Sequence, residues 1–91
     1  MYHLLLYSTV DDFVQMRIPL RKSHQDHVMA AFEKGTLLKA GALGKPADGV
    51  IFVFKDEQEE IIEEFAKNDP YVTNGLVSAW AIRLWNVNVG E

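Results

Sequence analysis

His24 is the residue of this sequence best suited to move a proton, because an imidazole titrates near neutral pH. In a helix through this segment, Leu20, His24, Val28 and Ala31 would form one stripe along the face. The stripe is otherwise apolar, and His24 lies within it. Arg21 would lie at the edge of the stripe, one turn earlier. A desolvated imidazole in that position is a candidate general base or acid. An equally weighted alternative is a neutral buried histidine that makes one structural hydrogen bond.

Asp69 supplies a carboxylate that can reach this histidine from a second helix. It stands directly before Pro70, and this pair suits the N-cap and the first residue of a short helix. On capping preferences alone, Asp69 does nothing more than cap that turn. If it also accepts a hydrogen bond from one imidazole nitrogen of His24, it would fix the tautomer and raise the basicity of the ring.

Other chemistries are weaker or excluded. The chain has no cysteine, which excludes disulfides and thiolate sites. His24 and His27 have a spacing at which they would share a metal, but no third ligand is evident, so we expect no metal. The net charge of -4 argues against nucleic-acid binding. No apolar run approaches the roughly 20 residues of a membrane span, so we expect a soluble, cytoplasmic protein.

The elements that position these residues follow a simple order along a single domain, residues 1–91. The apolar patterns and turn residues predict strands over 2–9, 36–43, 50–55 and 76–89, and helices from 19 to about 34 and from 56 to just before 70. Residues 13–18 predict a loop or an irregular turn. The order βαββαβ is that of an α+β protein, the split βαβ arrangement of a ferredoxin-like sandwich, with an antiparallel sheet and two helices on one face.

Three residues are expected to define the ends of the two main helices. Gly35 should stop the first helix in the left-handed conformation that glycine adopts without strain. Asp56 and Glu59 should form a capping box at the start of the second helix.

Both faces of the predicted sheet are apolar. In the first strand, Tyr2, Leu4 and Leu6 alternate with a second set that is also largely apolar. The helices cover only one face, and a bare apolar face of this size usually marks an interface. We therefore expect a homodimer that packs sheet against sheet around a two-fold axis. The alternative is that these residues are ordinary surface hydrophobes.

The residues that carry a family resemblance are Arg21-x-x-His24, Gly35 followed by Leu37–Gly41, and Asp69-Pro70-Tyr71. Over almost the whole chain the sequence resembles the YCII-like (YciI-like) family. The resemblance implies a ferredoxin-like protomer that forms a dimeric α+β barrel, as a homodimer or a higher oligomer. One departure is the loop from Gly44 to Gly49, which is short here, whereas the family often carries a longer segment with Gly and Pro at this place.

The resemblance also implies an active site built on a His–Asp pair, which falls on His24 and Asp69 of this sequence. The implied activity is cofactor-independent acid–base chemistry, of a lyase, isomerase or dehydrochlorinase type, on a small cyclic or aromatic compound. Arg21 would hold an anionic oxygen of this ligand, and His27, Pro70 and Tyr71 would contribute to the binding pocket.

Two other functions stay open at this level. In the first, the protein is a non-catalytic dimeric module that binds a small ligand or a partner, and the His24–Asp69 pair only ties two helices together. In the second, it is a barrel-type cofactor-independent oxygenase, which would need an aromatic pocket open to O₂.

Overall fold

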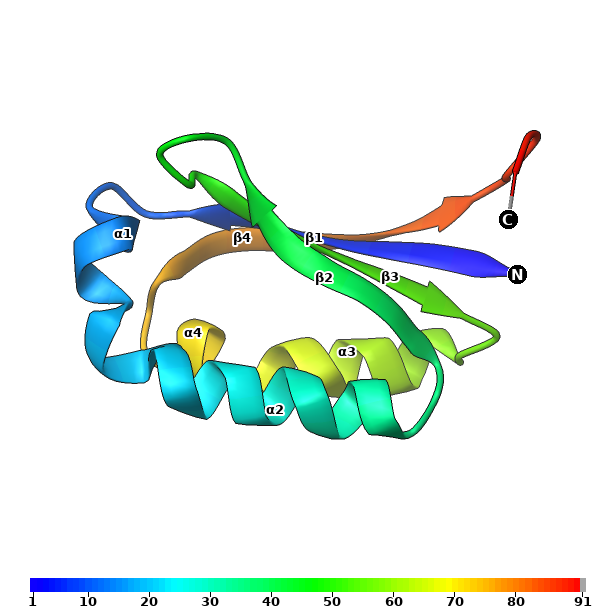
Figure 1. The fold of residues 1–91 in the computed structure, drawn as a ribbon, viewed down its shortest axis with the longest axis horizontal. Coiled ribbons are helices and arrows are strands. Elements are labelled where there is room, and N and C mark those ends of the chain that lie inside the picture. Colours follow the sequence, from blue (N-terminus) through cyan, green and yellow to red (C-terminus); the bar gives the residue numbers. More distant parts are fainter. Residues whose placement is uncertain (91) are drawn as a thin grey trace.

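A four-stranded antiparallel sheet forms one layer of the protein, and all the helices lie on one side of it (Figure 1). The computed structural model describes residues 1–90. The strands are β1 (Tyr2–Thr9), β2 (Leu37–Leu43), β3 (Gly49–Lys55) and β4 (Val77–Trp85), in the spatial order β2-β3-β1-β4. The predicted βαββαβ order and ferredoxin-like α+β fold are therefore confirmed.

The helical layer contains two long helices and three short helical turns. The long ones are α2 (Arg21–Glu33) and α3 (Glu59–Asn68); the short ones are α1 (Phe13–Met16), a 3-10 turn (Ile18–Leu20) and α4 (Pro70–Thr73). Gly35 adopts a φ of 96° just beyond α2, as expected for a left-handed stop. Within residues 1–90, no helix is both long enough and apolar enough to cross a membrane.

The predicted start of the second long helix is wrong. Helix α3 begins at Glu59 and its N-cap is Gln58, so Asp56 and Glu59 form no capping box. Asp56 instead has a φ of 57°, and its carboxylate lies 2.9 Å from the amino group of Met1. Its backbone N–H also donates to the Met1 carbonyl. The residue is thus used to join the end of β3 to the start of β1.

Three other boundaries differ from the sequence prediction. Residues 13–16 form a short helix where the sequence predicted a loop or an irregular turn. Pro19 lies in the 3-10 turn before α2 rather than in the helix itself. The last strand ends at Trp85, four residues earlier than predicted. It ends opposite the first residue of its antiparallel partner β1, since Tyr2 pairs with Trp85. Beyond that point no neighbouring strand remains to accept its hydrogen bonds.

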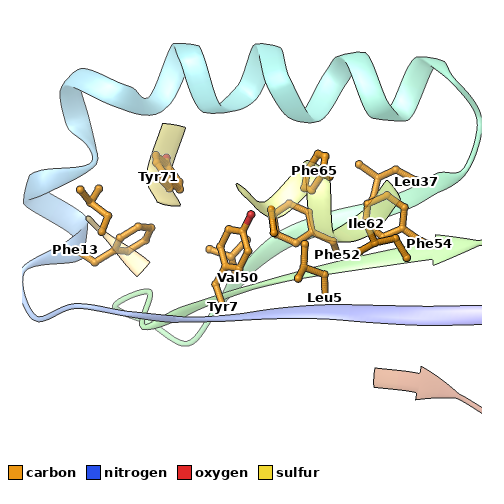
Figure 2. Close-up of a cluster of buried hydrophobic side chains, with 12 residues drawn as sticks. Leu5, Tyr7, Phe13, Leu37, Val50, Phe52, Phe54, Ile62, Phe65 and Tyr71 are labelled. Carbon is orange, nitrogen blue, oxygen red and sulfur yellow. The ribbon is translucent and has the colours of Figure 1, made fainter. Parts of the chain in front are cut away.

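The core lies between the sheet and the helices, and it is built by strict alternation along the strands (Figure 2). On β1, Leu5 and Tyr7 are buried, whereas Leu4 and Leu6 on the opposite face are half-buried. On β3, Phe52 and Phe54 are buried in the same layer. Helix α3 supplies the fully buried Ile62, while α2 has no fully buried residue. Helix α2 therefore covers the core loosely, which leaves room for a cavity along it.

Candidate active site

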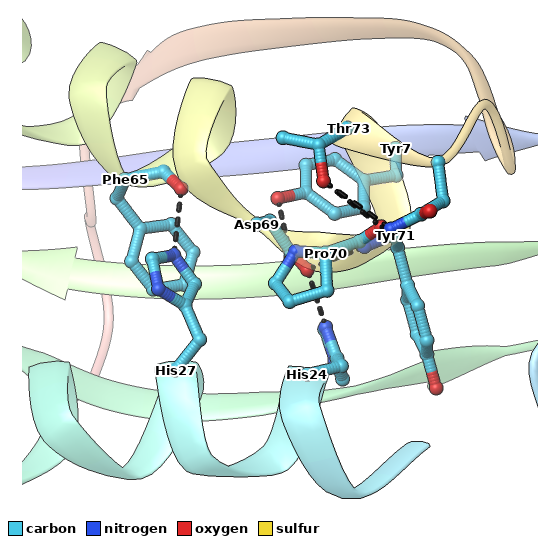
Figure 3. Close-up of polar contacts among 9 residues, drawn as sticks. Tyr7, His24, His27, Phe65, Asp69, Pro70, Tyr71 and Thr73 are labelled. Atoms are coloured by element: carbon cyan, nitrogen blue, oxygen red, sulfur yellow. Dashed lines mark hydrogen bonds and ion pairs between the residues drawn. The ribbon is translucent and has the colours of Figure 1, made fainter. Parts of the chain in front are cut away.

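His24 and Asp69 meet in the structure. Nδ1 of His24 lies 2.8 Å from Oδ1 of Asp69, although the two residues are 45 positions apart in the sequence (Figure 3). His24 projects from the first turn of α2, and Asp69 lies in the one-residue junction between α3 and α4. Helices α2 and α3 cover the same face of the sheet, so the junction at the end of α3 faces α2. The predicted contact between the two side chains is confirmed.

The Asp69 carboxylate is fully buried and makes three hydrogen bonds. Oδ1 accepts from His24 and from the backbone N–H of Tyr71 at 3.0 Å, and Oδ2 accepts from the Tyr7 hydroxyl at 2.8 Å. The bond to the Tyr71 N–H is the predicted N-cap of α4. Three donors compensate for the loss of water around a buried carboxylate, and they require its acceptor form. Asp69 therefore both caps α4 and holds His24.

This arrangement fixes the tautomer of His24. Because the carboxylate can only accept, Nδ1 must carry the proton, which leaves Nε2 as the basic nitrogen of the neutral ring. Within residues 1–90, Nε2 makes no hydrogen bond. The ring is held flat against Tyr71, with ring centroids 3.8 Å apart and an angle of 5° between the planes. A positioned imidazole with one free nitrogen is the arrangement that general acid–base catalysis requires.

Two tyrosines at the site have shifted acidities. Burial, followed by the negative charge of Asp69 and the hydrogen bond to it, raises the pKa of Tyr7 far above its ordinary value. Burial also raises the pKa of Tyr71. The positive charges of Arg17 and Arg21 partly offset this rise. Tyr7 therefore stays protonated and donates its hydrogen bond throughout the neutral range.

An open cavity of about 350 Å³ lies beside this constellation. Its walls come from the first turns of α2, the short helices α1 and α4, and the strands β2 and β3. His24, Arg21 and Tyr71 line it, together with apolar side chains such as Phe13 and Val50. Its volume is in the range of pockets for small organic ligands. Of the residues expected to bind a ligand, Arg21 and Tyr71 thus share one cavity with His24.

His27 and Pro70, which were also expected at the pocket, do not line this cavity. His27 lies one turn further along α2, where its Nε2 is 2.8 Å from the Phe65 carbonyl and its ring stacks on the Phe65 side chain. Pro70 is half-buried in the first turn of α4. Within residues 1–90, the acidic and histidine side chains form no cluster of three or more that could hold a metal.

The sequence prediction missed two residues of the site. Tyr7 belongs to the buried face of β1, and a buried phenol needs a hydrogen-bond partner, so its position alone indicated a polar group nearby. Arg17 also lines the cavity, and its guanidinium carbon lies 5.3 Å from the centroid of the Phe13 ring. The turn around Pro19 separates Arg17 from the helix that carries Arg21, so helical periodicity did not place the two arginines together.

A family model, the YCII-related domain, matches residues 1–86 of the chain. The chain belongs to the YCII-related family. This confirms the resemblance found in the Arg21-x-x-His24 and Asp69-Pro70-Tyr71 segments. No curated protein sequence matches this YCII-related chain.

Among solved structures, the YCII-related chain is similar to 5-chloro-2-hydroxyhydroquinone dehydrochlorinase (TftG) from Burkholderia phenoliruptrix AC1100, in complex with 2,5-dihydroxybenzoquinone. The TM-score is 0.82 at 22% sequence identity, and the match covers 97% of this chain and 96% of that chain. The similarity therefore extends over nearly the whole of both chains. At this level of identity it establishes a common fold.

Proposed function

We propose that this YCII-related protein is a cofactor-independent enzyme that transfers a proton to or from a small cyclic or aromatic compound. The observation that carries the proposal is the 2.8 Å contact between Nδ1 of His24 and the fully buried carboxylate of Asp69, with His24 in the wall of an open cavity. A His–carboxylate pair in a pocket is a recurrent arrangement for general acid–base catalysis.

In this proposal Nε2 of His24 removes the proton, and Asp69 stabilises the imidazolium that forms. The solved structure of similar fold is a dehydrochlorinase of a chlorinated hydroquinone, which suggests the same class of reaction here. In a dehydrochlorination the base takes a proton from the substrate, and the electron pair of the broken bond forms a new double bond. Chloride then leaves with the electron pair of its C–Cl bond, so that one HCl is lost.

Arg21 and Tyr71 are the proposed substrate-binding residues on the cavity wall. The Tyr71 ring also holds the imidazole plane, since the two rings stack at 3.8 Å. The functions proposed for His27 and Pro70 depend on a ligand that extends beyond the cavity, because neither residue lines it.

We further propose that the protein acts as a homodimer through the open face of its sheet. That face carries Leu4 and Leu6 from β1, Ile51 and Val53 from β3 and Trp85 from β4. Trp85 is 43% exposed, and its ring packs edge to face on the Tyr2 ring, with the two ring centroids 5.9 Å apart. Large apolar residues side by side on one face are typical of an interface.

The direct test is release of chloride from 5-chloro-2-hydroxyhydroquinone by the purified protein, without added cofactor or metal. We expect turnover, with a rate about 10²- to 10⁴-fold lower in His24→Asn, the range for loss of a general base. Asp69→Asn should also lower the rate, because the amide cannot stabilise the imidazolium. Asp26→Asn, which changes an exposed carboxylate on the same helix, is the matched control and should keep the wild-type rate.

Two results would decide against the proposal. Turnover that is unchanged in a folded His24→Asn variant would exclude His24 as the base. Absence of turnover in the wild type, combined with loss of folding in both variants, would favour a structural pair in a ligand-binding module.

A further inference from the structure

The charges around the cavity are the opposite of those of the whole chain. The protein has a net charge of -4, with 13 acidic residues against nine lysines and arginines. Yet the lining of the cavity contains no acidic residue, and it includes Arg17 and Arg21, two of the three arginines in the sequence. Asp69 lies behind His24, and its carboxylate accepts hydrogen bonds from three donors of the protein.

Neither arginine is neutralised by a protein carboxylate in the part of the chain that the structure describes, since its salt bridges involve other cations. Arg17 is half-buried, and its guanidinium is held by the Phe13 ring. Both arginines line the same cavity as Tyr71 and His24, so both can face a ligand that binds there. Two guanidiniums without a carboxylate partner beside an apolar wall are suited to bind an anion.

We infer that the substrate of the proposed reaction is an anionic ring compound, and that Arg17 and Arg21 together hold its negatively charged oxygen while the apolar wall binds the ring. This inference rests on the proposed function for its reacting centre, but it adds a requirement for negative charge and a second binding residue, Arg17. Either a carboxylate or an ionised phenol or enol meets this requirement, because a guanidinium binds both kinds of oxygen.

Binding of simple probes tests the inference without any need for turnover. Benzoate, benzamide and acetate are titrated into the wild-type protein up to tens of millimolar, while the NMR signals of His24 and Tyr71 are followed. Benzamide has the shape of benzoate without the charge, and acetate has the charge without the ring. We expect benzoate to bind about tenfold more tightly than either of them, the ratio for one lost charged contact or one lost ring.

Variants assign the charge to the two arginines. Arg17→Gln and Arg21→Gln should each weaken benzoate binding about five- to tenfold, because each removes one charged donor. Arg17→Lys keeps the charge but loses the planar guanidinium that packs on Phe13, so its affinity for benzoate should lie between those of the wild type and Arg17→Gln. Lys22→Gln, on the same turn but paired with Asp26 outside the cavity, is the control and should bind benzoate like the wild type.

Each outcome supports or overturns the inference. Equal binding of benzamide would overturn the charge requirement, and equal binding of acetate would overturn the requirement for a ring. No shift of the His24 and Tyr71 signals with benzoate, or an unchanged affinity in Arg17→Gln, would overturn the assignment of the site. These failures differ from failure of the proposed function, which would appear as absent turnover in a protein that still binds benzoate.

Discussion

Tyr7→Phe tests whether the buried hydrogen bond behind the candidate base contributes to folding as the structure indicates. The substitution removes only the hydroxyl that donates to Asp69 Oδ2 at 2.8 Å, and it leaves the ring in contact with Phe52. A buried hydrogen bond to a charged group contributes about 1.5–3 kcal/mol. At pH 7 we therefore expect Tyr7→Phe to lower the free energy of unfolding by about 1.5–3 kcal/mol.

The same residue predicts how this difference changes with pH. In the unfolded chain the pKa of Tyr7 is at its ordinary value of 10.0, and in the folded protein burial and Asp69 raise it well above that. Below pH 10 both states keep the proton, and the stabilisation by the hydrogen bond is fully present. Above pH 10 the unfolded chain loses the proton first, so the wild type should lose about 1.4 kcal/mol per pH unit that the phenylalanine variant does not lose.

The two effects together predict a crossing of the two stability curves. A difference of about 1.5–3 kcal/mol that shrinks by about 1.4 kcal/mol per unit above pH 10 vanishes between about pH 11 and 12. Urea unfolding at pH 7, 9, 10 and 11, followed by tryptophan fluorescence, measures the difference directly. A difference that is absent at pH 7, or that stays constant up to pH 11, would refute the reasoning.

Tyr2→Phe is the matched control for this experiment. Tyr2 lies on the same strand but on the open face of the sheet, and its hydroxyl makes no hydrogen bond among residues 1–90. Loss of its hydroxyl should change the free energy of unfolding by no more than about 0.5 kcal/mol at any of these pH values.

Three further substitutions test the packing and the assembly. Gly49→Ala should destabilise the fold by about 1–3 kcal/mol in urea unfolding, because the added Cβ would lie 2.9 Å from a backbone oxygen of β1. The control is Gly41→Ala, whose added Cβ meets no atom within 4 Å and which should therefore be nearly neutral. Ile62→Ala, at a fully buried position, should cost about 2–5 kcal/mol, and the same change at the neighbouring exposed Ile61 should cost less than about 1 kcal/mol. Leu6→Glu should convert the proposed dimer to a folded monomer in sedimentation velocity, and a protein that is already monomeric as wild type would contradict the proposed interface.

The sequence was sufficient where a local pattern has one physical solution. Alternation along β1 separated Leu5 and Tyr7 from Leu4 and Leu6, and the structure buries the first pair against the helices. Gly35 ends α2, and Asp69 caps α4 through the Tyr71 N–H, because both effects involve only neighbouring backbone groups.

Local reasoning failed where distant groups compete for the same residue. The residues around Asp56 predict a helix cap. In the structure, the amino group of Met1 pairs with the Asp56 carboxylate and the Met1 carbonyl accepts from its N–H, and α3 starts three residues later. Met1 is far from Asp56 in the sequence, so the residues around Asp56 do not reveal this contact. The positions of Tyr7 and Arg17 at the site depend in the same way on strands and turns that pack only in the folded protein.

By itself, the sequence determined the order of the elements, the two faces of the sheet and the presence of one histidine and one carboxylate on neighbouring helices. Only the tertiary structure decided that the Asp69 carboxylate is fully buried, that it accepts from Tyr7 as well as His24, and that both arginines share one cavity. The reason is physical: periodicity and capping act between residues a few positions apart, whereas burial and electrostatics depend on every group that the fold brings within a few ångströms.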